Sequence, residues 1–241
     1  RHLCIRDSQI RGGLGTQLLN LMAAYGDAFE KGKDIEKIVL NFFNYPDGLR
    51  EVNIDFISKT IEHHLKVETK SGTDKFAIFN KDRIENVKKH IHKIRRSMPV
   101  KLNDMKPIAE TILHVRQLDR PLVSVNTYID IIVDKDGLEP WIIIGDDMKT
   151  LQNIIDSSES FVNHSPYDND SVREWFMLCK SRLVVGGFSS YVLSAALLNP
   201  GLEYKMIKKG KCNEEHLTGY DWKCLDLFVE LFDNINWIDY D

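Results

Sequence analysis

The chain has 241 residues, of which 43% are hydrophobic, so it can bury one large core or two smaller ones. Its 32 basic and 36 acidic residues give a net charge of -4, which argues against general nucleic-acid binding, because that function usually requires a basic excess. No apolar run approaches the roughly 18 residues that span a membrane, and no segment resembles a signal peptide, so we expect no transmembrane segment and a cytoplasmic protein. A Golgi-lumenal protein is the alternative if a leader or an anchor precedes Arg1.

A glycine-rich turn lies between a predicted strand and a predicted helix near the N-terminus. His2 to Arg6 is the predicted strand, and the turn from Ile10 to Gln17 contains three glycines, Gly12, Gly13 and Gly15. The apolar residues that follow are spaced as on one face of a helix: Leu18, Met22, Tyr25 and Phe29. We interpret Thr16 as the N-cap of this helix. Strand, glycine turn and helix in this order bring backbone amides close to a phosphate, although glycine turns also serve plain packing.

The middle of the chain is mixed and strongly charged. Lys37 to Phe42 is a predicted strand, and a helix is expected from Asp55 to Leu65. Lys81 to Ser97 is a predicted helix with a basic run from Lys88 to Arg96. Given the acidic net charge, we interpret this run as a solvated helix face rather than a nucleic-acid site. The polar segment from Pro99 to Pro107 is interpreted as a linker.

Predicted strands and helices alternate regularly after this linker. Strands are expected at 111–116, 141–145, 160–163 and 182–185, and helices at 126–134, 147–156, 171–179 and 190–198. This alternation indicates a parallel sheet with right-handed crossovers. A last amphipathic helix is expected from Asp221 to Phe232.

The four cysteines form no C-x-x-C pair: Cys4, Cys179, Cys212 and Cys224. Two of them lie inside apolar stretches, which favours buried free thiols in a reducing compartment. A disulfide between Cys212 and Cys224 is the alternative if the protein is secretory.

A cation and an anion follow the first strand of the C-terminal half. His114 lies at the end of this predicted strand, and Arg116 and Asp119 come directly after it. The carboxyl ends of strands in an open α/β sheet face the ligand, and a guanidinium there suits an anion such as a phosphate. An ion pair that closes a loop is the structural alternative.

Two further strand ends carry acidic and hydroxyl side chains. Asp146 and Asp147 follow the strand at 141–145, where they would either hydrogen-bond a ribose or a base edge or cap the next helix. Ser189 and Ser190 stand where the last helix of the alternating region begins. Hydroxyls and free amides at a helix start form a phosphate site, or a plain helix cap.

Together these motifs resemble those of the α-1,2-fucosyltransferases and, more distantly, of the α-1,6- and protein O-fucosyltransferases. The family shares a Gly-Gly-Leu-Gly-Asn-Gln turn, matched by Gly12 to Gln17, and a His-x-Arg-Arg-x-Asp motif, matched at His114, Arg116 and Asp119. Its apolar strand ending in Ser-Asp-Asp is matched by Ile142 to Asp147. Its Leu-Cys-Lys and Ser-Ser segments are matched by Leu178 to Lys180 and Ser189 to Asn199. The match covers about 110–199 and the glycine turn, and residues 40–105 align with nothing in the family.

The resemblance implies an α/β, GT-B-like fold of two Rossmann-like units facing across a cleft. Residues 1–105 would form the acceptor-side unit, residues 106–205 the nucleotide-sugar unit, and residues 206–241 a C-terminal helix that packs back on the first unit. The resemblance further implies an inverting, metal-independent transfer of fucose from GDP-fucose to a hydroxyl of a galactoside-like glycan acceptor. No cofactor and no metal are expected.

The resemblance also assigns roles to residues of this chain. Arg116 would contact the donor diphosphate and is, with Asp119, a catalytic candidate. His114 would lie near the ribose, and Asp146 or Asp147 near the nucleoside. Ser189 and Ser190 would hold the β-phosphate. The glycine turn would approach the phosphates from the other unit through Gly12, Gly13, Gly15, Thr16 and Gln17.

Four positions depart from the family pattern. Gln117 replaces the second arginine, Thr16 the asparagine of the glycine turn, Phe188 the asparagine before the serines, and Val192 a serine. These departures motivate two alternatives, a degenerate transferase that binds a nucleotide-sugar or glycan without turnover, and a transferase that uses another GDP-sugar. A metal-dependent GT-A-type enzyme using Asp134-Lys-Asp136 is a further alternative, although that triplet precedes Gly137 as in a turn.

Overall fold

A computed structural model describes residues 3–5, 14–32, 35–42, 66–71, 80–98, 111–117, 123–134, 141–158, 162–167, 171–207 and 222–238. The chain divides into two compact units. The N-terminal unit contains residues 1–104 and 221–232, and the C-terminal unit contains residues 105–220 and 233–241. No helix in the described part of the chain is long and apolar enough to cross a membrane.

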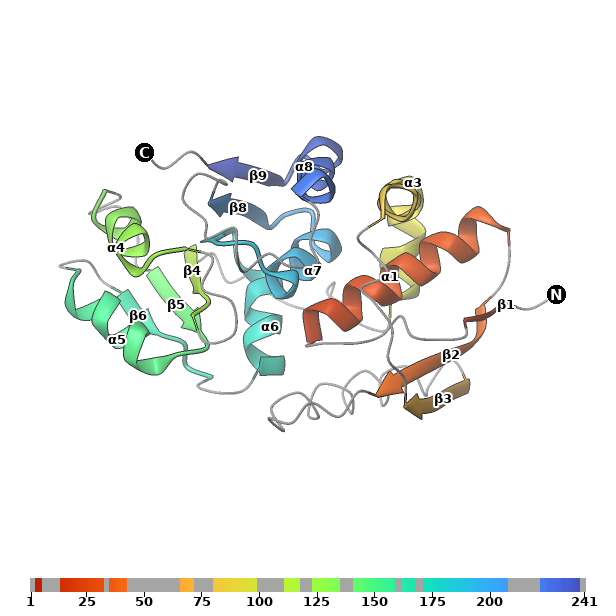
Figure 1. Cartoon of the computed structure of the whole chain (residues 1–241), viewed down its shortest axis with the longest axis horizontal. Helices are drawn as coiled ribbons and strands as arrows, with labels where there is room; N and C mark the ends of the chain where they lie inside the picture. The colour runs from red at the N-terminus through yellow and green to blue at the C-terminus, as the bar shows by residue number, and fades with distance from the viewer. Residues whose placement is uncertain are drawn as a thin grey trace. The chain divides into compact units, whose positions relative to one another are not determined.

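Among the described residues, the N-terminal unit contains a parallel sheet in the order β1-β2-β3 and three helices (Figure 1). Its strands are β1 (Leu3–Ile5), β2 (Ile35–Phe42) and β3 (Lys66–Ser71), and its helices are α1 (Leu14–Glu30), α3 (Lys81–Ser97) and α8 (Trp222–Leu231). α3 packs on α1, and α8 packs on α3. Strands β1 and β2 and these three helices confirm sequence predictions, whereas β3 was not expected. The helix predicted from Asp55 to Leu65 lies outside the described residues.

Helix α1 begins two residues earlier than Thr16, so the prediction that Thr16 is its N-cap is wrong. Leu14 and Gly15 are already helical, and Thr16 lies in the first turn with only 4% of its surface exposed. A helical glycine costs about 0.5–1 kcal/mol relative to alanine. Burial of Leu14, which is 2% exposed, offsets that cost and extends the helix.

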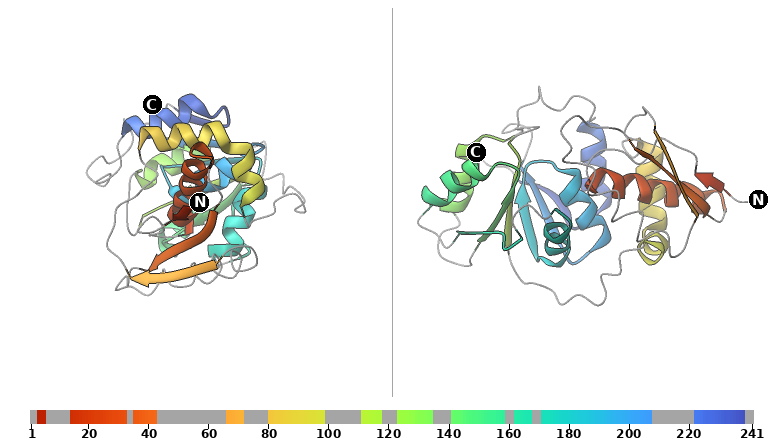
Figure 2. Two further views of the ribbon diagram at one scale, coloured as in Figure 1. Left: turned by 90° about the vertical axis from the view of Figure 1, so that its right-hand side faces the viewer. Right: turned by 90° about the horizontal axis from the view of Figure 1, so that it is seen from below.

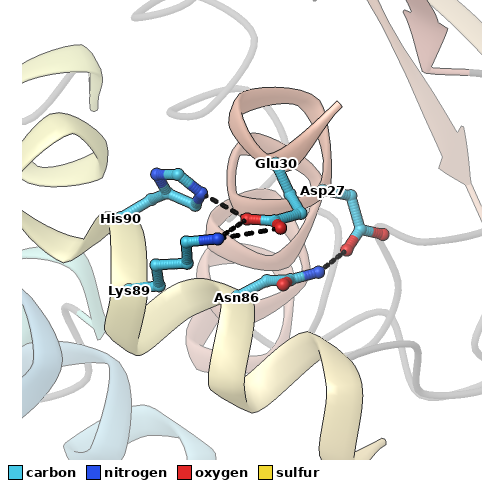
Figure 3. A network of polar contacts seen from close by, with 5 residues as sticks. All are labelled: Asp27, Glu30, Asn86, Lys89 and His90. Carbon is cyan, nitrogen blue, oxygen red and sulfur yellow. Dashed lines mark hydrogen bonds and ion pairs between the residues drawn. The ribbon is translucent and has the colours of Figure 1, made fainter. Parts of the chain in front are cut away.

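Helix α3 is fixed to α1 by the polar residues that gave it a charged pattern (Figure 3). Asn86 donates a hydrogen bond to Asp27 at 3.2 Å. Lys89 and His90 both bind the carboxylate of Glu30, at 2.8 Å each. Hydrogen bonds from Lys89 and then His90 hold the pKa of Glu30 below its ordinary value. The basic run is therefore partly a packing surface, and not only the solvated face that we predicted.

The C-terminal unit is built on a six-stranded sheet in which every pair of neighbours is parallel. Its strands are β4 (Thr111–Val115), β5 (Trp141–Gly145), β6 (Val162–His164), β7 (Leu183–Gly186), β8 (Glu203–Ile207) and β9 (Ile235–Ile238). Its helices are α4 (Val125–Asp134), α5 (Met148–Asp156), α6 (Ser171–Lys180) and α7 (Ser190–Leu198). Helices α4 and α5 cover one face of the sheet, and α6 and α7 cover the other (Figure 2). The predicted parallel α/β architecture is confirmed.

The predicted C-terminal helix, α8, belongs to the N-terminal unit, whereas the residues that follow it return to the C-terminal unit. Strands β8 and β9 were both missed, and β9 joins the sheet of the C-terminal unit. β9 is four residues long and lies at the edge of the sheet, so its short sequence carries little periodic signal. The described cysteines, Cys179 and Cys224, are buried and neither forms a disulfide, so the alternative disulfide of Cys224 is not present.

Strand order in this sheet creates a topological switch point between β4 and β7. The order is β6-β5-β4-β7-β8-β9, so the chain runs outward from β4 to β6 and then returns to the other side of β4. This is the doubly wound order of Rossmann-type sheets, in which ligands bind beyond the carboxyl ends of the strands at the switch point. The two strands that flank it, β4 and β7, are buried along their whole length.

Glycines let β4 lie unusually close to both of its neighbours. Added to Gly145, a Cβ atom would lie 2.5 Å from the carbonyl oxygen of Val115. Added to Gly186, it would also lie within 3.0 Å of a backbone oxygen, that of His114, a distance that real Cβ atoms essentially never show. The close packing at the carboxyl ends of these three strands therefore depends on glycine.

Candidate functional site

The predicted site residues of the C-terminal unit that the structure describes gather at the carboxyl ends of β5, β4 and β7, which are adjacent in the sheet. His114 pairs with Gly186 across the switch point, and Val115 pairs with Gly145 on the other side. Arg116, Asp146 and the start of α7 follow directly from these paired positions. The sheet thus brings together three motifs that are far apart in the sequence.

His114 is buried at the end of β4 and contacts the first turn of α7. It is 7% exposed, and its ring lies against the ring of Tyr191 with the centroids 6.0 Å apart. The Tyr191 hydroxyl donates a hydrogen bond to the carbonyl oxygen of Ser171, so Tyr191 also ties α7 to the start of α6. Arg116 is half-buried, and Asp119 lies outside the described residues.

Gln117 stands where the family has a second arginine. It makes hydrogen bonds to neighbouring parts of the same unit. Its side-chain amide donates a hydrogen bond to the carbonyl oxygen of Val123 at 2.8 Å. Its backbone N–H donates to the carboxylate of Asp146 at 2.7 Å. Asp146 therefore ties the end of β5 to the segment after β4.

Asp147 caps α5. Its carboxylate accepts hydrogen bonds from the backbone N–H of Lys149 at 3.3 Å and from the hydroxyl of Thr150 at 2.5 Å. The bond from Thr150 is the main reason that the pKa of Asp147 lies below its ordinary value. Of the two interpretations of this strand end, the structure gives Asp147 the capping role.

Ser189 caps α7, and both its hydroxyl and its backbone N–H make hydrogen bonds. Its hydroxyl accepts the backbone N–H of Tyr191 at 3.2 Å, and its own N–H donates to the hydroxyl of Tyr204 at 3.0 Å. Ser190 is the first helical residue and is 7% exposed. Tyr204 was not identified from the sequence, because β8 was not predicted.

The glycine-turn residues belong to the N-terminal unit. Gly12 and Gly13 lie outside the described residues, whereas Gly15, Thr16 and Gln17 are buried in the first turn of α1. One turn further along, Asn20 is 0% exposed, and neither atom of its side-chain amide has a hydrogen-bond partner. The sequence signal for Asn20 is an amide inside an otherwise apolar run.

The side chains at the switch point suit a ligand that carries both a negative charge and a ring system. Arg116 supplies a guanidinium, and the start of α7 supplies the positive end of a helix dipole. His114 supplies a buried imidazole, and Asp146 an exposed carboxylate. Within the described ranges, no three His, Cys, Asp or Glu side chains are grouped to hold a metal ion. The Asp134-Lys-Asp136 triplet reaches beyond these ranges.

Comparisons with known protein families and with curated proteins find no match to the chain. Among solved structures, the chain is similar to the E. coli heptosyltransferase WaaC with ADP-2-deoxy-2-fluoro heptose. The similarity covers 92% of this chain and 97% of that chain, with 11% sequence identity and a TM-score of 0.45. A likeness this distant does not decide the function, which has to be argued from the site itself.

Proposed function

We propose that the chain is a glycosyltransferase whose C-terminal unit binds a nucleotide-sugar at the switch point between β4 and β7. The observation that carries the proposal is the convergence of Arg116, Asp146 and the Ser189–Ser190 helix start on adjacent strand ends. These groups suit, in that order, a diphosphate, a ribose or base edge, and a phosphate. Each belongs to a motif that the chain shares with the fucosyltransferases.

The motif resemblance extends the proposal to GDP-fucose as donor and a glycan hydroxyl as acceptor. In the proposed inverting reaction, the acceptor oxygen forms a bond to C1 of fucose while the bond from C1 to the GDP oxygen breaks. The electron pair of the breaking bond leaves with GDP, and a base removes the proton of the acceptor hydroxyl. Arg116 is proposed to stabilise the charge that develops on the diphosphate, without a metal. Asp119 remains a second catalytic candidate.

Thermal unfolding with nucleotides tests this proposal. GDP or GDP-fucose, added without metal, is expected to raise the Tm of the wild type, because a ligand that binds only the folded state stabilises it. Arg116→Ala is expected to abolish the rise. Arg182→Ala is the matched control, since Arg182 lies at the opposite end of the sheet, where it binds the Thr111 hydroxyl at 3.4 Å. No rise with any member of a panel of GDP-, ADP- and UDP-sugars would refute the proposal.

A degenerate transferase that binds without turnover is the second candidate. The observation that favours it is the use of Gln117 within its own loop, which leaves the site without the cation that the family has there. Incubation with GDP-fucose and simple galactosides, followed by mass measurement of the products, separates the two functions. A fucosylated product excludes the degenerate form, whereas a Tm rise without any product supports it.

A further inference from the structure

The hydroxyl of Tyr204 fixes the loop that joins β7 to α7. Tyr204 lies on β8 and is 0% exposed. Its hydroxyl accepts a hydrogen bond from the backbone N–H of Ser189 at 3.0 Å and donates one to the carbonyl oxygen of Gly187 at 2.8 Å. Both bonds are buried, so one side chain sets the backbone on each side of Phe188.

Ser189 links this loop to the first turn of α7. The N–H of Ser189 is held by Tyr204, while its hydroxyl caps the N–H of Tyr191 and its carbonyl oxygen accepts the N–H of Leu193 at 2.9 Å. A shift of Ser189 therefore moves the whole first turn of the helix. The Ser189 N–H and the Gly187 carbonyl bond to the Tyr204 hydroxyl inside the buried core. Losing that hydroxyl is costly, because it would leave two buried polar groups without a partner.

We propose that Tyr204 is a positioning residue for the diphosphate of the donor. It makes no contact with the donor itself, and it acts through the backbone of Gly187 and Ser189 to place the helix start that bears Ser190. This inference rests on the proposed function, which puts the β-phosphate at that helix start. The nucleoside end of the donor, proposed to lie near Asp146 at the end of β5, should be insensitive to Tyr204.

The affinities for GDP and GMP, measured by calorimetry, test this role. Tyr204→Phe keeps the buried ring and removes the hydroxyl with both of its hydrogen bonds. It is expected to weaken GDP binding about tenfold, while GMP binding is unchanged. Ser194→Ala is the matched control. Ser194 is also 0% exposed on α7, and its hydroxyl also accepts one N–H, from Trp175 at 2.9 Å, and donates to one carbonyl, that of Tyr191 at 2.8 Å.

The ratio of the two affinities separates positioning from general destabilisation. Ser194→Ala is expected to lower the Tm without changing the GDP-to-GMP ratio. An unchanged ratio in Tyr204→Phe, or the same change in both variants, overturns the inference.

Amide hydrogen exchange in the unliganded wild type gives a second test that needs no variant to fold. The Ser189 amide, held by Tyr204, is expected to exchange only through global unfolding of the C-terminal unit. Fast exchange of this amide overturns the inference. A protected Ser189 amide in a protein that binds none of the GDP-, ADP- and UDP-sugars refutes the proposed function instead, and shows that the loop contact exists without such a ligand.

Discussion

Gly186→Ala is expected to destabilise the C-terminal unit, because the sheet leaves no room for a Cβ atom at this position. The added atom would overlap the carbonyl oxygen of His114, the partner of Gly186 on β4, and would lie 3.3 Å from the His114 Cβ. The overlapping atom belongs to the backbone of a strand buried along its whole length, so it cannot rotate away. Overpacking costs about 1–3 kcal/mol, and a backbone overlap belongs at the upper end, about 3 kcal/mol.

Thermal unfolding followed by tryptophan fluorescence measures this cost. Three of the four tryptophans belong to the C-terminal unit: Trp141, Trp175 and Trp237. In a chain of this size, 1 kcal/mol corresponds to about 2–4 °C in Tm, so the expected decrease is about 6–12 °C. Gly201→Ala is the matched control, since its Cβ would meet the Asn199 side chain at 3.2 Å and Gly201 is exposed. Its effect should stay within about 0.5 kcal/mol.

Equal Tm values for the two alanine variants would refute the reasoning about the β4–β7 approach. The same variant also tests the place of the ligand. Because the overlap lies at the switch point, Gly186→Ala is expected to weaken GDP binding even well below its own Tm. A destabilised Gly186→Ala protein with wild-type GDP affinity would show that the nucleotide does not bind beside this strand pair.

Two further predictions concern the N-terminal unit. Asn20→Leu is expected to raise the free energy of unfolding by about 1–3 kcal/mol, because it removes a buried amide with no hydrogen-bond partner. Urea denaturation followed by circular dichroism measures this free energy. A decrease of the same size would show that the amide is needed. The contact of Glu30 with Lys89 and His90 is expected to weaken in acid. The pKa of Glu30 is lowered from 4.5, so its stabilising effect is present above that pH and is lost as the pH falls through the lower folded value. The Tm difference between wild type and Glu30→Gln should therefore shrink below pH 4.5, and a pH-independent difference would contradict this.

The sequence by itself determined most of the elements of the C-terminal unit. The strand Trp141–Gly145 and the helix Ser190–Leu198 have the predicted bounds, because an apolar run and a helical spacing are local signals. It also determined that polar groups stand at strand ends, and hence which residues were candidates. It left two interpretations at each strand end, since a capping residue and a ligand-binding residue have the same sequence pattern.

Only the tertiary structure decided how these strand ends are combined. Local patterns are the same for every possible strand order, and the switch point between β4 and β7 exists only because β7 pairs with β4 rather than with β6. Contacts between residues that are far apart in the sequence decided the rest. The backbone N–H of Gln117 bonds to Asp146, and Tyr204 holds Ser189 from a strand that the sequence did not reveal. Such contacts depend on which strands become neighbours, and short segments carry no signal of that pairing.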